Sequence, residues 1–149
     1  MKTQRVYNRA EATRRLWDRL CTIPDFVTRG RVLRDWSDLQ PEEKPALFMI
    51  AGNQRVDTAS QKLPSVLHMF FTLFVYAHKA QADDITPSDE LNRLLDLIEQ
   101  SIDPGIAMPY QTLGLDNCQH VYVSGMIETD EGSLGSDAVA IVPLTMLLT

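Results

Sequence analysis

The stretch LPSVLHMFFTLFVYAHK, from Leu63 to Lys79, decides the fold that we expect for this chain. Its odd-numbered positions from 67 to 77 are all apolar, whereas its even-numbered positions mix aromatic rings with polar tips. Because side chains alternate between the two faces of a strand, this parity predicts one long β-strand with a dry face and an amphipathic face. At about 3.3 Å per residue such a strand spans on the order of 50 Å, far more than usual. We therefore expect other elements to cover it or to extend beside it.

Length and composition predict a single domain over residues 1–149. A chain of 149 residues with 44% hydrophobic content is long enough for one core and too short for two ordinary domains. The opening MKTQRVYNRAEATRRLW carries charges where a signal peptide needs an apolar run, and no later stretch has the roughly 18 apolar residues of a membrane span. Cys21 and Cys118 are lone thiols, which suit a reducing compartment. We expect a protein made in a cytosol.

The net charge of −6 hides a division between the two halves of the chain. Residues 1–62 carry twelve Lys or Arg against eight Asp or Glu, and residues 63–149 carry two against twelve. A monomer with one basic and one acidic region can pack on copies of itself, head to tail. The alternative is an acidic surface that serves only solubility.

We expect residues 1–28 to form a helical N-terminal segment, with an amphipathic helix over residues 6–23. Apolar side chains recur there at spacings of three and four, and Pro24 ends the pattern. The arginines off this stripe would form a solvated face or a subunit contact, because interrupting acidic residues disfavour a nucleic-acid contact. The stripe consists of Ala10, Thr13, Leu16, Trp17, Leu20 and Ile23.

Two strands are expected before the long one. RGRVLRDW, residues 29–36, alternates like a half-buried strand, and PALFMIA, residues 45–51, is an apolar run short enough to be a buried strand. The following GNQRVDTASQKLP, residues 52–64, is predicted to be a turn or a longer loop. Three successive strands with such links favour antiparallel pairing.

A second helix is predicted to begin after Thr86. Thr86 can cap the first amide groups, Pro87 fits the first helical position, and Asp89 lies three residues after the cap. Asp103-Pro104-Gly105 terminates the helix. Its apolar stripe consists of Leu91, Leu94, Leu95, Ile98 and Ile102.

The C-terminal part predicts two more strands, over residues 120–128 and 138–148, joined by an acidic hairpin loop at residues 128–137. Because proline removes a ladder donor, Pro143 should place the last strand at an edge or cause a bulge. The expected fold class is α+β: a mainly antiparallel sheet of about five strands with two helices packed on one face, in the order α-β-β-β-α-β-β.

The sequence offers little for catalysis. It contains no phosphate loop, dinucleotide-binding turn, nucleophile elbow or zincin helix. His68 and His78 would lie roughly 30 Å apart, and Cys118 with His120 offers two ligands where a structural zinc site needs four. His120 with a carboxylate of the acidic hairpin would stand on a poor platform for acid–base chemistry. We predict no enzyme activity, no catalytic or metal-binding residues and no cofactor.

Several stretches carry a resemblance to a known family: PALF (45–48), DELNRLLDLIE (89–99), QTLG (111–114), VYVSGMIE (121–128) followed by DEG (130–132), and VAIVPL (139–144). Together they resemble small tail proteins of tailed bacteriophages, most closely the tail terminator, or tail completion, family. The resemblance extends over most of the chain, from about residue 29 onward.

This resemblance implies a virion structural protein that works by geometry. Such a protein forms a homo-hexameric ring at the head-proximal end of the tail tube, stops tube polymerisation and joins the tail to the neck or connector. Its partners would be itself, the tail tube protein and the neck protein, with DNA passing through the ring without specific binding. It would assemble in the host cytoplasm and reside in the virion.

Two residue sets are candidates for these contacts. Arginines and aromatic residues are candidates for the subunit interface, although the aromatic residues of the long strand also suit a core. The acidic hairpin is a candidate for the lumen or the tube contact, where it would repel phosphates; alternatively, it orders only on docking. The interface candidates are Arg29, Arg31, Arg34, Trp36, Phe70, Phe74 and Tyr76. The lumen candidates are Glu128, Asp130, Glu131 and Asp137.

Two alternatives come from other classes of protein. A head–tail connector, or neck adaptor, would form a ring of a different size on the portal side. A small ligand-binding module or enzyme would be a stable monomer with a deep cleft near His68, Tyr76 or His120.

Overall fold

The computed structural model describes residues 7–58, 65–79, 86–105, 109–131 and 135–149. It contains two helices and one six-stranded, mostly antiparallel sheet, so the α+β class is confirmed. The expected element order is also confirmed, with the strand predicted over residues 120–128 divided in two. The elements are α1 (Arg9–Leu20), β1 (Thr28–Gly30), β2 (Ala46–Asp57), β3 (Val66–His78), α2 (Pro87–Ile102), β4 (Cys118–Val123), β5 (Glu128–Glu131) and β6 (Asp137–Leu148).

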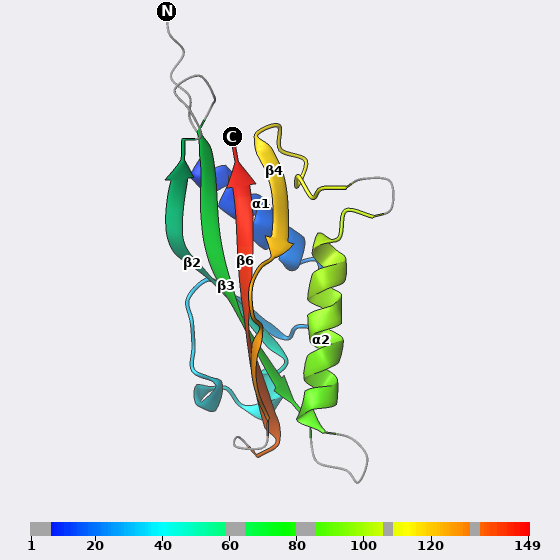
Figure 1. Cartoon of the computed structure of the whole chain (residues 1–149). Coiled ribbons are helices and arrows are strands. Elements are labelled where there is room, and N and C mark those ends of the chain that lie inside the picture. Colours follow the sequence, from blue (N-terminus) through cyan, green and yellow to red (C-terminus); the bar gives the residue numbers. More distant parts are fainter. Residues whose placement is uncertain (1–6, 59–64, 80–85, 106–108, 132–134) are drawn as a thin grey trace, which may run out of the picture.

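The strands lie in the order β1-β2-β3-β6-β4, and β5 pairs with β6 beyond the end of β4. Figure 1 shows β2, β3, β6 and β4 side by side, with α1 crossing behind them. The long strand predicted from parity is β3, which pairs with β2 on one side and with β6 on the other. The β3–β6 register is unbroken from Leu67, opposite Leu148, to His78, opposite Asp137.

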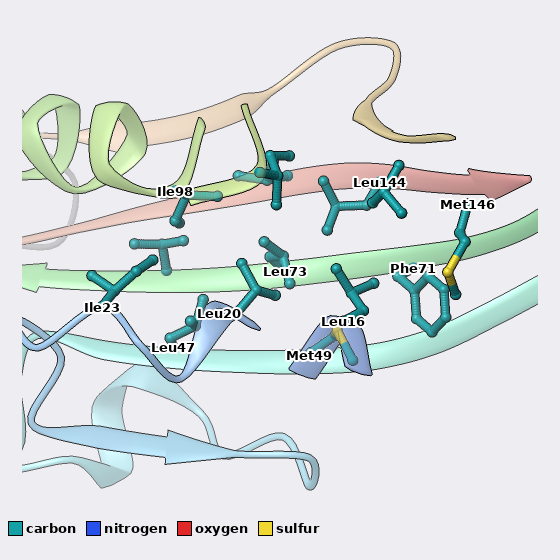
Figure 2. Packing of buried hydrophobic residues seen from close by; sticks show 14 of the residues in the cluster. Leu16, Leu20, Ile23, Leu47, Met49, Phe71, Leu73, Ile98, Leu144 and Met146 are labelled. Atoms are coloured by element: carbon teal, nitrogen blue, oxygen red, sulfur yellow. The ribbon is translucent and has the colours of Figure 1, made fainter. Parts of the chain in front are cut away.

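Both helices cover the same face of the sheet. The odd-numbered side chains of β3 are buried there with the apolar stripes of α1 and α2, as the parity predicts. Figure 2 shows this layer, in which Leu16 and Leu20 of α1 and Ile98 of α2 meet Leu73 and Leu144 of the strands. The prediction that the helices lie on one face is therefore confirmed.

The prediction of a strand over residues 29–36 was wrong beyond Gly30. β1 has three residues and runs parallel to β2, so the expected antiparallel pairing of these two strands was also wrong. After Gly30 the chain leaves the sheet, and Asp35 accepts a hydrogen bond from the Ser37 amide as a short 3-10 turn begins at Trp36. The alternating pattern of these residues therefore does not reflect burial, because residues 31–35 are exposed and Trp36 is half-buried.

β2 continues through the segment predicted as a loop. Its register against β3 shifts between Ala51 and Gln54, which is a β-bulge, and pairing then resumes as far as Asp57. Gly52 lies at this bulge, where an added Cβ would come within 3.1 Å of the Phe70 carbonyl oxygen. The glycine and polar residues from which a turn was predicted therefore lie where the strand changes register and continues.

Pro143 does not place β6 at an edge, because β6 lies between β3 on one side and both β4 and β5 on the other. The Pro143 carbonyl accepts a hydrogen bond from the Ser124 amide at 2.9 Å, so the backbone polar side of Pro143 faces β4. β4 ends at Val123 and β5 begins at Glu128, so the sheet partner is interrupted where proline lacks a donor.

The bounds of α1 differ from the predicted ones, whereas α2 agrees with its prediction. α1 begins at Arg9 and ends at Leu20, which is shorter than the predicted 6–23, and Ala12 is buried where Ala10 was expected. α2 begins as predicted, since Thr86 and Asp89 form a capping box with Pro87 in the first turn.

Replacing Leu94 should destabilise the fold, because Leu94 is fully buried between α2 and the sheet. We expect Leu94→Ala to lower the free energy of unfolding by about 2–5 kcal/mol. The matched control, Asn92→Ala on the exposed side of the same helix, should change it by less than about 0.5 kcal/mol. Urea denaturation at one fixed protein concentration measures both; equal losses would contradict the placement of α2.

Candidate assembly surface

Among the residues that the structure describes, no α-helix covers the second face of the sheet, which we call the open face. The even-numbered residues of β3 point to this face, because its odd-numbered residues are buried under the helices. Residues directly opposite each other in paired strands project to the same side, so the odd-numbered residues of β6 point to it as well. Its central side chains are half-buried and mostly apolar, which leaves a broad surface of intermediate exposure. These side chains are Ile50, Phe70, Thr72, Tyr122, Ile141, Pro143 and Leu147.

One end of the open face is covered by the loop between β1 and β2. Leu39 of this loop packs with Phe48 and Tyr76 in a second, smaller core, and Trp36 lies at its margin. The Tyr76 hydroxyl donates to the Arg34 carbonyl oxygen at 2.6 Å, which fixes the loop on the strand. Burial raises the pKa of Tyr76 to about 12.

The three aromatic interface candidates of β3 therefore have different surroundings. Tyr76 is 4% exposed and belongs to the smaller core, and Phe74 is half-buried at the border of that core. Phe70 is half-buried in the part of the open face that no described element covers, where it stacks on His68. Of the three, Phe70 is the residue that the structure leaves available for a contact.

The three arginine candidates all have exposed side chains, and each also makes a contact within the chain. Arg29 donates to the Ile23 carbonyl oxygen, and Arg31 Nε donates to the Met49 carbonyl oxygen at 3.1 Å. Arg34 forms an ion pair with Glu43 at 3.2 Å. Each arginine is therefore held by a different partner within the chain.

The acidic candidates do not form one surface either. Residues 128–131 form strand β5, where a hairpin loop was predicted, and all four are exposed. Residues 132–134 of the predicted loop lie outside the described residues. Glu128 and Asp130 lie opposite Ile141 and Val139 and therefore project to the open face. Glu131 projects to the helix-covered face, where it accepts a hydrogen bond from the Ser88 amide in the first turn of α2.

Asp137 has an internal role. Its carboxylate lies 3.0 Å from Lys44 Nζ and accepts a hydrogen bond from His78 Nδ1 at 2.8 Å. The Lys44 side chain is only 3% exposed, and its ammonium group also lies over the Trp36 ring. A buried ammonium needs such a partner, so Asp137 compensates a charge inside the chain.

Both edges of the sheet have stretches that no other described strand pairs with. Among the described strands, β1 pairs with the outer side of β2 only at Ala46–Phe48, and β6 is the only partner of β5. Residues 51–57 of β2 are exposed, and Asp57 there contacts His68 and Arg55. Free edges can pair with a strand of another chain.

A groove that sequence reasoning missed lies between α1 and the free edge of β2. It has a volume of about 450 Å³, and α1 contributes arginines and Trp17 while the sheet contributes Ala51 and Met69. Arg31 reaches it from the loop after β1. The sequence held one signal for it, which was the row of arginines beside the apolar stripe of α1.

The histidines and cysteines offer no metal site among the described residues. Within the described ranges, no three His, Cys, Asp or Glu residues are close enough to hold a metal ion. The His120 Nδ1 accepts a hydrogen bond from the Gln111 amide, and burial lowers the His120 pKa and raises the Cys118 pKa to about 11. A hollow of about 500 Å³ lies beside His120, lined also by Tyr110 and Leu147.

Comparison with known proteins finds no matching family model, and no curated protein matches the sequence. None of the helices, over the residues that the structure describes, is both long and apolar enough to cross a bilayer.

Replacing Asp137 should be costly because it leaves the Lys44 ammonium buried without its carboxylate. We expect Asp137→Asn to lower the free energy of unfolding by about 3 kcal/mol. Asp96→Asn on the exposed side of α2 is the matched control, and it should change stability by less than about 0.5 kcal/mol because Asp96 is exposed. Thermal and urea unfolding measure both variants. Equal losses of stability in the two variants would contradict the internal role of Asp137.

The Tyr76 phenol should titrate late, because its pKa is raised to about 12 from the ordinary value of 10.0. Between these values the unfolded chain binds fewer protons than the folded chain, so the contribution of Tyr76 to stability is full below pH 10 and is lost as the pH rises through about 12. Absorbance titration of the phenolates should show a late step that Tyr76→Phe removes. A late step that persists in the variant would show that the step does not come from Tyr76, which would contradict the raised pKa of Tyr76.

Proposed function

We propose that this protein is a virion structural protein that forms a homo-hexameric ring at the head-proximal end of a phage tail tube. The ring ends tube polymerisation and joins the tail to the neck or connector. The protein assembles in the host cytoplasm, contacts the tail tube and neck proteins, and lets DNA pass without binding it specifically. It acts without catalysis, metal or cofactor.

The observation that carries this proposal is a sheet left incomplete by its own chain. β2 and β3 are twelve and thirteen residues long, and the centre of the open face is apolar and half-exposed. Both edges also have stretches that no other described strand pairs with. Surfaces of this kind favour association with other copies or with neighbouring proteins. A heterologous contact closes into a ring when its rotation permits. The resemblance to tail terminators then supplies the place of the ring.

The head–tail connector remains the second candidate, because the same incomplete sheet would suit any ring in the neck. The two candidates differ in the number of subunits and in the protein that the ring binds. A terminator ring binds the end of the tail tube, whereas a connector ring binds the portal side.

The purified protein should have a native mass close to six times the 16.8 kDa chain mass. Negative-stain images should show closed rings with six subunits. Added to polymerising tail tube protein, it should stop growth, so that mean tube length falls as its concentration rises. A protein that is monomeric alone and in the presence of tube ends would overturn the proposal; a ring of another size that ignores tubes would favour the connector.

A further inference from the structure

The groove beside β2 is a positively charged site next to an unpaired sheet edge. Arg9 and Arg31 line it, and among the described residues neither has a carboxylate partner: Arg9 Nε donates to the Gln54 side chain at 2.6 Å and Arg31 Nε to a backbone carbonyl. Arg14 also lines the groove but is neutralised by Glu11 and Asp18. Two guanidinium groups are therefore available to an acidic segment.

The opposite edge of the sheet is an acidic strand. β5 has the sequence ETDE, so three of its four residues are acidic, and all four are exposed. It is shorter than the exposed stretch of β2 at residues 51–57, so all of β5 fits along that stretch. Because the strand order places β2 and β5 on opposite sides of β3 and β6, the two edges of one molecule cannot meet each other.

The charges select which edges can pair. Two copies of β5 side by side would place like charges opposite each other, which is destabilising. The edge of β2, with Arg9 and Arg31 beside it, offers β5 the opposite charge. Pairing of unlike edges is head to tail, as a ring requires, whereas pairing of like edges would stop at a dimer.

We propose that the subunit joint is formed by the acidic strand β5 of one copy, which docks along the free edge of β2 in the next copy beside the arginine groove. The inference rests on the proposed function, and it names the surfaces that the ring would use. It also moves Glu128 and Glu131 from the predicted lumen to the joint. Because Glu128 and Glu131 project to opposite faces of β5, one of the two lies on the groove side of the joint, where Arg9 and Arg31 meet it.

Two charge-reversed proteins test the joint. One carries Arg9→Glu with Arg31→Glu, and the other carries Glu128→Lys with Glu131→Lys. Each alone should lose the ring and show the mass of a single chain, because its own two edges have become alike in charge. A one-to-one mixture should restore the ring, because the acidic groove of the first variant fits the basic β5 of the second, and the unchanged edges fit each other.

The matched control is Asp96→Lys with Glu99→Lys, which makes the same change of charge on the exposed side of α2. It should assemble like the unmodified protein. Circular dichroism verifies that every variant is folded. As a measurement that needs no variant, raising salt from about 0.05 M to about 1 M should weaken association of the unmodified protein at least tenfold.

The outcomes separate this inference from the proposed function. If the unmodified protein forms hexamers while either variant alone still assembles, or while the mixture fails to restore the ring, the joint is wrong and the ring proposal stands. Assembly that is insensitive to salt would also overturn the joint. If the unmodified protein is monomeric even with tube ends present, the proposed function fails, and the joint fails with it.

Discussion

The pairing of β3 with both of its neighbours is the constraint on which the rest of the structure depends. Its odd-numbered side chains fix which face the helices cover, and its unbroken register with β6 carries that choice across the sheet. A slip of one residue would exchange the two faces and expose Leu73 and Phe71. With the helix-covered face fixed, the open face and the two outer edges are what remains for contacts with other molecules.

Much of the fold could be predicted because its strongest signals are local. The parity of β3 and the capping box at Thr86 depend on neighbouring residues only, and both predictions were confirmed. The failures lie where tertiary contacts decide. The bond from Tyr76 to the Arg34 carbonyl holds a loop where alternation predicted a strand, and the bulge at Gly52 continues a strand where composition predicted a turn.

The candidate surface was harder to predict from the sequence than the fold. The acidic residues are close together in sequence but lie in different places. Glu128 and Glu131 project to opposite faces because side chains alternate along a strand, and Asp137 forms an ion pair with Lys44. The arginine groove joins residues from α1, the loop after β1 and β2, which no single stretch reveals. A motif search cannot find a site whose members come from three elements and share only charge.

The order of the elements along the chain explains why basic residues lie toward one edge of the sheet and acidic residues toward the other. The basic residues 1–62 supply α1, β1 and β2, and the acidic residues 63–149 supply α2 and the strands on the other side of β3. Exposed charge pairs contribute only about 0–1 kcal/mol each, so a few of them orient an encounter more than they hold a ring together. Most of the strength of such a joint must come from backbone pairing of the edges and from apolar contacts such as those offered by Trp17 and Met69 in the groove.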